Sequence, residues 1–233
     1  MKCIGVLGGM SWESTVSYYQ ALNRGVRTRL GGLHSARVLL SSVDFAEIER
    51  LQHAGDWPAT ALLLGKAAQS LQAGGADCLL IATNTMHKVA DEIAASVDIP
   101  LLHIADATAR RLREDGIDTV GLLGTRFTME QDFYKGRLRD KFGLKVLVPT
   151  AAAQARVHRI IYEELCQGEI KEASRADYLA IIGELAAAGA EAVILGCTEI
   201  ALLVGESPAA VPLYDTTVLH AEAAVVWSLD EPI

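Results

Sequence analysis

Two short polar motifs contain the side chains of this chain best suited to proton transfer: TNTMH (Thr83 to His87) and GCTE (Gly196 to Glu199). The thiol of Cys197 can act as an acid or a base near neutral pH, because the pKa of a free cysteine is ~8.5. The hydroxyl of Thr83 is a much weaker acid, and the polar side chains after it begin a predicted helix, a place that suits an anion such as a carboxylate. The alternative interpretations are an inert buried cysteine and an ordinary helix cap.

The two motifs occupy matching positions in an internal repeat. Three pairs of segments recur in the same order at nearly constant spacing: Ile4 to Trp12 with Val120 to Thr128, Leu71 to Thr85 with Leu185 to Glu199, and Ile99 to Leu102 with Val211 to Tyr214. This recurrence indicates a duplication, in which Thr83 falls opposite Cys197. Two reactive side chains related by pseudo-symmetry are expected to face one cleft from opposite sides.

Around these motifs the chain alternates between short apolar runs and longer segments of helical spacing, which is typical of βα units with a parallel sheet. We predict an α/β fold of two pseudo-symmetric lobes, each a four-stranded parallel sheet flanked by helices, with the active site between the lobes. Lobe 1 is expected to contain residues 1–98 and 213–233 with the TNTMH site, and lobe 2 residues 99–212 with the GCTE site. Both motifs then lie at the carboxyl ends of strands, where open parallel sheets bind their ligands.

The strands predicted for the first sheet are Cys3–Leu7, Ala36–Ser41, Cys78–Ala82 and Leu101–His103, and those for the second are Thr119–Leu123, Lys145–Val148, Ala192–Leu195 and Leu213–Tyr214. The predicted helices are Ser14–Arg29, Trp57–Ala73, Met86–Ala95, Ile104–Glu114, Met129–Phe142, Ala152–Gln167, Glu172–Ala188, Ile200–Val204 and Leu219–Leu229.

The composition is that of a packed globular protein, with 51% hydrophobic and 21% charged residues among 233. A net charge of −8 argues against a nucleic-acid partner, which would require a basic face. No apolar run reaches the ~18 residues of a membrane span, and the N-terminus enters a strand directly, so we expect a cytoplasmic protein without a membrane partner. The four cysteines contain no Cys-x-x-Cys pair, which argues against a metal site.

The local sequence also suggests how two of these residues behave. Cys197 stands between an apolar run and the next predicted helix, so the positive end of that helix is expected to lower the pKa of the thiol. His87 lies inside the helix that follows the first motif, and we interpret it as a structural residue rather than an acid or a base.

Four motifs together resemble the aspartate/glutamate racemase family across essentially the whole chain: GGMSWEST near the start, TNTMH, LLGT in the second half, and GCTE. The resemblance implies an enzyme without a cofactor, an active site between two α/β lobes, and a homodimer. It further implies that two side chains flank the α-carbon of a small acidic amino acid, one removing the α-proton and the other delivering a proton to the opposite face. Family members usually have cysteine at both positions, and the threonine here is similar to the branch that acts on L-aspartate and L-glutamate.

By this resemblance the catalytic residues are Thr83 and Cys197. Forming an alkoxide at pH 7 costs on the order of 10 kcal/mol and forming a thiolate about 2 kcal/mol, so Cys197 is expected to be the better base and turnover to be weak. The residue that neutralises the distal carboxylate stays open, because the position aligned with the family's cationic group is Glu164. The residues implied in substrate binding are Met10, Gln52, Asn84, Thr85, Thr125, Thr198 and Glu199.

Two other functions fit the same motifs. The sequence also resembles maleate isomerases, hydantoin racemases and arylmalonate decarboxylases, so an isomerase or decarboxylase of another small acidic substrate is one alternative. The other is a protein that binds an acidic amino acid with little turnover, because one thiol of the pair is missing. Exchange of the substrate α-proton separates an enzyme from a binding protein.

Overall fold

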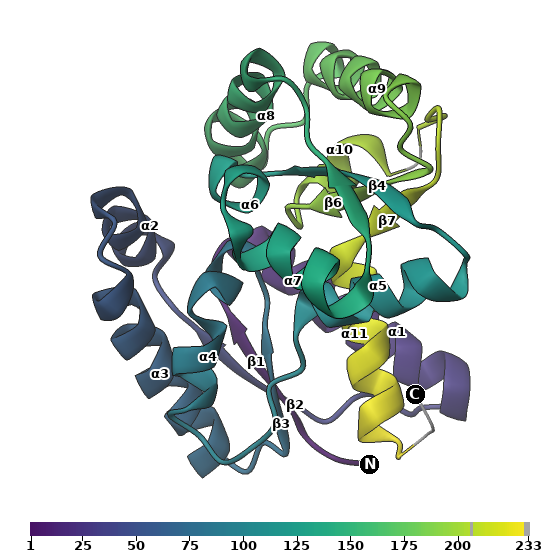
Figure 1. Ribbon diagram of the computed structural model, residues 1–233. Coiled ribbons are helices and arrows are strands. Elements are labelled where there is room, and N and C mark those ends of the chain that lie inside the picture. Colours follow the sequence, from purple (N-terminus) through teal and green to yellow (C-terminus); the bar gives the residue numbers. More distant parts are fainter. Residues whose placement is uncertain (206, 231–233) are drawn as a thin grey trace. The chain divides into compact units, whose positions relative to one another are not determined.

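The computed structural model describes residues 1–205 and 207–230. The chain divides into two compact units: unit 1 contains Met1–Ile104 and the chain from His220 onward, and unit 2 contains Ala105–Leu219. The chain therefore crosses from unit 1 to unit 2 after Ile104 and returns before His220, a path that the colours of Figure 1 follow from purple to yellow. Each crossing lies a few residues beyond the boundary expected from the repeat.

Unit 1 contains a three-stranded parallel sheet in the order β2-β1-β3. The strands are β1 (Ile4–Gly8), β2 (Val38–Ser42) and β3 (Cys78–Ile81). Its helical segments are α1 (Trp12–Leu30), α2 (Phe45–Ala54), α3 (Trp57–Ala73), η1 (Thr85–Val89) and α4 (Ala90–Ala94), with the start of α5 (Ile104–Glu114) and most of α11 (Thr216–Ser228).

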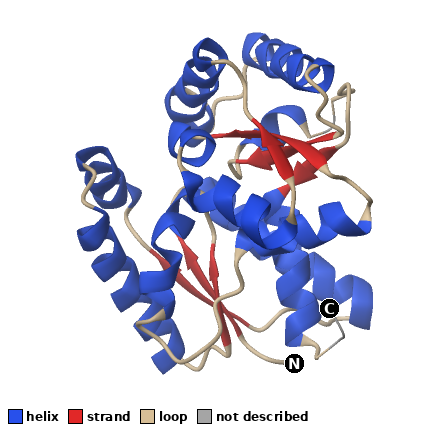
Figure 2. Cartoon of the chain, in the orientation of Figure 1, coloured by secondary structure: helices blue, strands red, loops and turns tan. Residues whose placement is uncertain are grey.

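Both faces of the unit 1 sheet are covered by helices, as Figure 2 shows with red strands and blue helices. Alternate residues of a strand point to opposite faces. Leu7 of β1 therefore belongs to the core that includes Leu64 of α3, whereas Val6 packs with Tyr18 of α1 and Val225 of α11. Burial on both faces explains why the strands read as continuous apolar runs in the sequence.

Unit 2 contains a four-stranded parallel sheet in the order β5-β4-β6-β7. Its main core joins strand residues such as Leu123 and Val193 to Ile160, Tyr178 and Leu185 on the covering helices. The strands are β4 (Thr119–Gly124), β5 (Lys145–Leu147), β6 (Ala192–Gly196) and β7 (Leu213–Asp215). The remaining helical segments are α6 (Arg126–Glu130), α7 (Asp132–Phe142), α8 (Ala151–Glu163), η2 (Leu165–Gln167), α9 (Glu172–Ala187) and α10 (Ile200–Val204).

Equivalent hydrogen bonds in the two units confirm the internal repeat. The Leu79 N–H donates to the carbonyl oxygen of Pro100 at 2.9 Å, and the Val193 N–H donates to that of Pro212 at 2.9 Å. The glycine after α3 has a φ of +94° (Gly75), and its counterpart after α9 has a φ of +99° (Gly189). The repeat therefore preserves the strand pairing and the turns that lead into β3 and β6.

The α/β class with two parallel sheets is confirmed, but the expected fourth strand of the first sheet, Leu101–His103, is wrong. Only an isolated bridge between Leu79 and Leu101 forms there. The carbonyl oxygen of Leu102 accepts from the Nε2 of His220 at 2.7 Å, and the next residue already precedes α5. Because the Leu102 carbonyl accepts from His220 and not from an N–H of β3, the hydrogen bonds between the two segments do not continue as a strand ladder.

Several helices also differ from the sequence expectation. Helix α2 was not predicted; it begins after Asp44, whose side chain accepts from the Ala46 N–H, and ends at Gly55 with a φ of +71°. The single helix expected over Met129–Phe142 is two, α6 and α7, because Gln131 is extended. Among the described residues, no helix combines the length and apolarity needed to cross a bilayer.

His220 is fully buried in unit 1, and both of its ring nitrogens have partners. Nε2 donates to the Leu102 carbonyl, so Nδ1 accepts from the Tyr18 hydroxyl at 2.9 Å. This neutral ring leaves no place for a second proton. Burial lowers the pKa of His220 from 6.5 to about 4.

We expect this histidine to make folding stability depend on pH. The unfolded chain binds a proton near pH 6.5 and the folded chain only near pH 4, so the free energy of unfolding should fall by up to about 3 kcal/mol as the pH drops through this window. In urea unfolding, the free energy of unfolding of the His220→Gln variant should fall less than that of the wild type between about pH 7 and about pH 4.5, by up to about 3 kcal/mol. The exposed His34→Gln variant is the control, and an unchanged pH dependence in His220→Gln would contradict the assignment.

Candidate functional site

The first half of the candidate site lies at the carboxyl ends of β1 and β3 in unit 1. β1 is followed by Gly9, which has a φ of +90° and donates its N–H to the Oγ1 of Thr15 at 2.8 Å. A Cβ at Gly9 would overlap the carbonyl oxygen of Val43. Glycine is therefore needed for the turn that carries Met10, whose side chain is buried.

Thr83 follows β3 at the same edge of the sheet. Its side chain is partly exposed, whereas Asn84 and Thr85 after it are buried. The His87 N–H donates to the Asn84 carbonyl at 3.1 Å, which closes the first turn of η1. The motif thus begins a short 3₁₀ helix and then α4, in place of the single predicted helix.

Gln52 is buried in the last turn of α2. The loop before α2 is tied to the end of β1, because the Val43 N–H donates to the Gly8 carbonyl at 3.0 Å. The segments after all three strands therefore leave the same edge of the sheet. They contain the five site residues predicted for this unit: Met10, Gln52, Thr83, Asn84 and Thr85.

The second half of the candidate site lies at the carboxyl ends of β4 and β6 in unit 2. Gly124 and Gly196 are partners in the ladder, and a Cβ at Gly124 would lie 2.9 Å from the Gly196 carbonyl oxygen. This close approach places the residues after them, Thr125 and Cys197, beyond adjacent strand ends. Thr125 is buried and caps α6 by accepting from the Thr128 N–H at 3.4 Å.

One buried carboxylate organises the GCTE motif. The Sγ of Cys197 donates to the Oε2 of Glu199 at 3.0 Å, and the Oγ1 of Thr198 donates to the same oxygen at 2.7 Å. Cys197 is 8% exposed and Glu199 only 2%. The structure thus brings the three predicted residues of this motif together as one hydrogen-bonded group.

The expected lowering of the Cys197 pKa is wrong. Burial raises the pKa of this thiol well above its ordinary value, and the negative charge of Glu199 raises it further. The following helix, α10, has only five residues, and the nearest full charge to the sulfur is a carboxylate. Cys197 therefore rests as a protonated thiol in this unit, and it needs a compensating positive charge before it can act as a base.

Glu164, Ser174 and Tyr178 are further buried polar residues of unit 2, and of these only Glu164 was singled out from the sequence. Glu164 accepts from the Ser174 hydroxyl at 2.5 Å and lies 3.9 Å from the Lys171 Nζ, so it supplies no cation for a distal carboxylate. Burial raises the pKa of Tyr178 well above 10, and the nearby Cys197 and Glu164 add to this effect. Ser174 and Tyr178 were detectable only as polar residues at helical spacing on the otherwise apolar face of α9.

Each half-site offers one side chain that can transfer a proton, beside polar groups that can hold a small charged molecule. In unit 1 these are the Thr83 hydroxyl with an amide and a second hydroxyl, and in unit 2 the Cys197 thiol with a hydroxyl and a carboxylate. Within residues 1–205 and 207–230, no three His, Cys, Asp or Glu side chains gather as candidate metal ligands. A hydroxyl and a thiol placed beside such polar groups can transfer protons to and from a small polar substrate.

Replacing Glu199 by glutamine should lower the pKa of Cys197, because the amide keeps a hydrogen-bond acceptor but carries no charge. We expect iodoacetamide at about pH 8 to alkylate Cys197 faster in the Glu199→Gln variant than in the wild type, as followed by peptide mass spectrometry. Glu184→Gln, the same change at an exposed position of α9, should leave the rate unaltered. An equal or slower rate in Glu199→Gln would show that its charge does not control the thiol.

Comparison with known proteins places this arrangement in one family. The family model for Asp/Glu/hydantoin racemase matches residues 7–224. The chain is similar to a proposed Asp/Glu racemase from Yersinia pestis, with 55% identity and a TM-score of 0.91 over 98% of this chain and 100% of that one. It is similar to an aspartate racemase homologue from Pyrococcus horikoshii OT3, with 32% identity and a TM-score of 0.85 over 98% and 100%. The aspartate racemase of Picrophilus torridus, at 23% identity and a TM-score of 0.81 over 100% and 96%, has the same fold. The chain therefore belongs to the Asp/Glu/hydantoin racemase family of isomerases.

Proposed function

We propose that this protein racemises L-aspartate and L-glutamate without a cofactor, with Cys197 removing the α-proton and Thr83 returning one to the opposite face. The observation that carries the proposal is the equivalence of these two residues in the repeat. Each follows the strand that pairs with the central strand of its unit, β3 beside β1 and β6 beside β4. The aspartate racemase homologue among the relatives supports aspartate as a substrate.

The Glu199 carboxylate couples substrate binding to activation of the thiol. Its charge raises the pKa of Cys197, and its Oε2 accepts the hydrogen bond of the thiol. An amino-acid substrate brings an ammonium group, for which Glu199 is a ready counter-ion. Neutralising that charge favours the thiolate, and Glu199 also orients the sulfur. We therefore assign Glu199 to both the substrate ammonium and the orientation of Cys197.

The remaining predicted residues are proposed to hold the substrate. We assign Asn84, Thr85 and Thr198 to the α-carboxylate and the amino group, because short polar side chains after strand ends can donate to an anion. Met10, Gln52 and Thr125 are proposed to border the pocket. All six side chains are buried in their own units, so they can exclude water from the reacting centre.

Threonine in place of a second thiol makes the two steps unequal. A hydroxyl, which is a far weaker acid than a thiol, can donate a proton to a carbanion, but the alkoxide that this leaves, and that must act as the base in the reverse direction, costs on the order of 10 kcal/mol to form near pH 7. Proton removal by Cys197 should therefore be fast relative to complete inversion. The same substitution favours the second candidate, a protein that binds an acidic amino acid and turns it over little.

Incubation of the enzyme with L-aspartate and L-glutamate in heavy water tests the scheme. We expect α-deuteration by mass spectrometry to run ahead of inversion measured by chiral chromatography. The Thr83→Cys variant should raise inversion by about tenfold or more, because a thiol is the better acid and base. Ser35→Cys, which adds a thiol at an exposed loop position, is the control. The absence of any α-deuteration would reject the enzyme in favour of the binding protein, and a Thr83→Cys variant no faster than wild type would reject the role of Thr83.

We further propose a cytoplasmic homodimer, with an exposed apolar stripe on α1 as part of the interface. Trp12, Val16 and Tyr19 recur at helical spacing and are 65%, 45% and 56% exposed in the single chain. Large aromatic side chains left exposed in a stripe are typical of protein interfaces. The stripe begins directly after the turn that carries Met10, so a second copy bound there would lie close to that turn.

Light scattering coupled to size exclusion should report a dimer for the wild type. The Tyr19→Lys variant should dissociate at least about tenfold more readily, since it places a charge in an apolar contact. Gln20→Lys, at the adjacent exposed position, should remain dimeric. A wild-type monomer at micromolar concentration would overturn the dimer, and an intact Tyr19→Lys dimer would place the interface elsewhere.

A further inference from the structure

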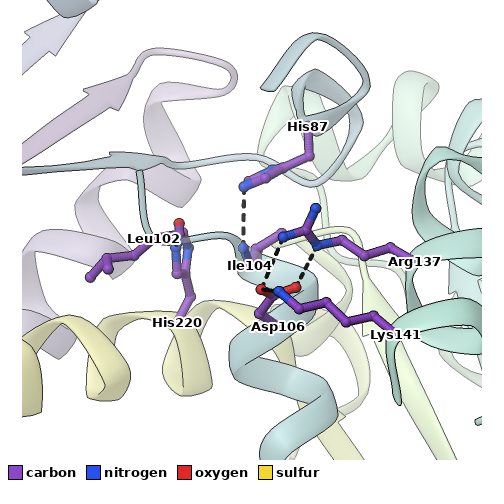
Figure 3. A network of polar contacts seen from close by, with 7 residues as sticks. All are labelled: His87, Leu102, Ile104, Asp106, Arg137, Lys141 and His220. Atoms are coloured by element: carbon purple, nitrogen blue, oxygen red, sulfur yellow. Dashed lines mark hydrogen bonds and ion pairs between the residues drawn. The ribbon is translucent and has the colours of Figure 1, made fainter. Parts of the chain in front are cut away.

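His87 joins the Thr83 half-site to the point where the chain leaves unit 1. Its Nδ1 lies 2.8 Å from the carbonyl oxygen of Thr83. Its Nε2 accepts the N–H of Ile104 at 3.2 Å, the bond drawn at the centre of Figure 3. A carbonyl only accepts and a backbone N–H only donates, so the ring must be neutral with its proton on Nδ1.

The surroundings of His87 hold the ring in this orientation. The side chain is 3% exposed, and its ring centroid lies 4.4 Å from that of His103 and 5.9 Å from that of His220. His220 is itself fixed by Leu102 and Tyr18. Two further imidazoles, those of His103 and His220, thus contact this ring, and the Tyr18 phenol contacts the second of them.

The far end of the His87 contact is also anchored. Ile104 is the first residue of α5, and Asp106 in the same turn is held in unit 2 by Arg137 and Lys141, with the Arg137 Nη2 at 2.9 Å (Figure 3). The backbone on both sides of the chain crossing is thus held by side chains. Within unit 1, the Ile104 N–H and the rings of His103 and His220 hold the imidazole against the Thr83 carbonyl.

The sheet does not hold the Thr83 peptide, because β3 ends at Ile81. The repeat places Ala201 opposite His87, so unit 2 has no equivalent imidazole. There the reactive residue is held through its own side chain, by the Cys197 bond to Glu199. The two half-sites therefore orient their proton-transferring groups by different means.

We propose that His87 is a positioning residue for Thr83: its Nδ1–H bond fixes the Thr83 peptide and, through it, the direction of the hydroxyl. The inference rests on the proposed role of Thr83 in returning the proton. A displacement of about 1 Å at a reacting group can cost on the order of 10²-fold in rate. Because Cys197 has its own partner in unit 2, loss of the His87 bond should slow inversion and leave α-deuteration by Cys197 in place.

Two polar variants separate the two bonds of the ring. Asparagine places an amide N–H where Nδ1 stands, so His87→Asn can still donate to the Thr83 carbonyl. Glutamine places its amide where Nε2 stands, so His87→Gln can accept from Ile104 but does not reach Thr83. We expect inversion of L-aspartate to fall by about tenfold or more in His87→Gln and to stay within about threefold of wild type in His87→Asn. In both variants α-deuteration in heavy water should stay within about twofold of wild type.

Exposed His34→Gln serves as the control for loss of a histidine, and thermal unfolding shows that each variant is folded. Wild-type inversion in folded His87→Gln, a larger loss in His87→Asn than in His87→Gln, or an equal loss of inversion and α-deuteration would each overturn the positioning role.

A measurement made without substrate tests the role of His87 separately from the proposed racemase activity. Nitrogen-15 NMR of histidine-labelled protein should show His87 protonated at Nδ1 and His220 protonated at Nε2. A His87 protonated at Nε2 would overturn the inference whatever the activity. A wild-type enzyme that shows the expected tautomer but exchanges and inverts neither amino acid would contradict the proposed function instead.

Discussion

Both half-sites depend on one constraint, the parallel pairing of a buried central strand with its neighbour. Parallel strands end at the same edge of a sheet, so the residues after β4 and β6 come together although they are far apart in the sequence. The pairing is tight where the site begins: a Cβ at Gly196 would lie 2.8 Å from the Leu123 carbonyl oxygen. Small residues at these strand ends let the backbones approach and leave the following side chains to form the site.

The duplicated backbone carries different chemistry in its two copies. Thr83 and Cys197 occupy equivalent positions, but a hydroxyl and a thiol differ by several pKa units in acidity. The position two residues further is Thr85 in one unit and Glu199 in the other, so a negative charge stands beside only one of the reactive groups. The scaffold can thus be nearly symmetric while the acid and the base are not.

Burial gives the Glu199 carboxylate its influence. In a solvated site its charge would be screened, whereas at 2% exposure it acts at close range on the Cys197 thiol. The same burial makes an unneutralised charge costly, which favours binding of a cationic group. Under the proposed function, the substrate ammonium neutralises the charge of Glu199 and thereby favours the thiolate form of Cys197. The energy of substrate binding then contributes to the chemical step.

The repeat, the α/β class and the polar motifs at strand ends could be predicted from the residues alone, because they depend on local patterns: apolar runs, glycines at turns and short polar side chains in fixed order. Features that depend on contacts between distant segments became visible only in the folded chain. The Leu102 carbonyl turns to His220 and ends the first sheet at three strands, and the fold alone brings Ile104 to the ring of His87. Burial likewise reversed the expected pKa shift of Cys197. Neither the desolvation of the thiol nor the direction of the Glu199 carboxylate can be predicted from the neighbouring residues in the sequence.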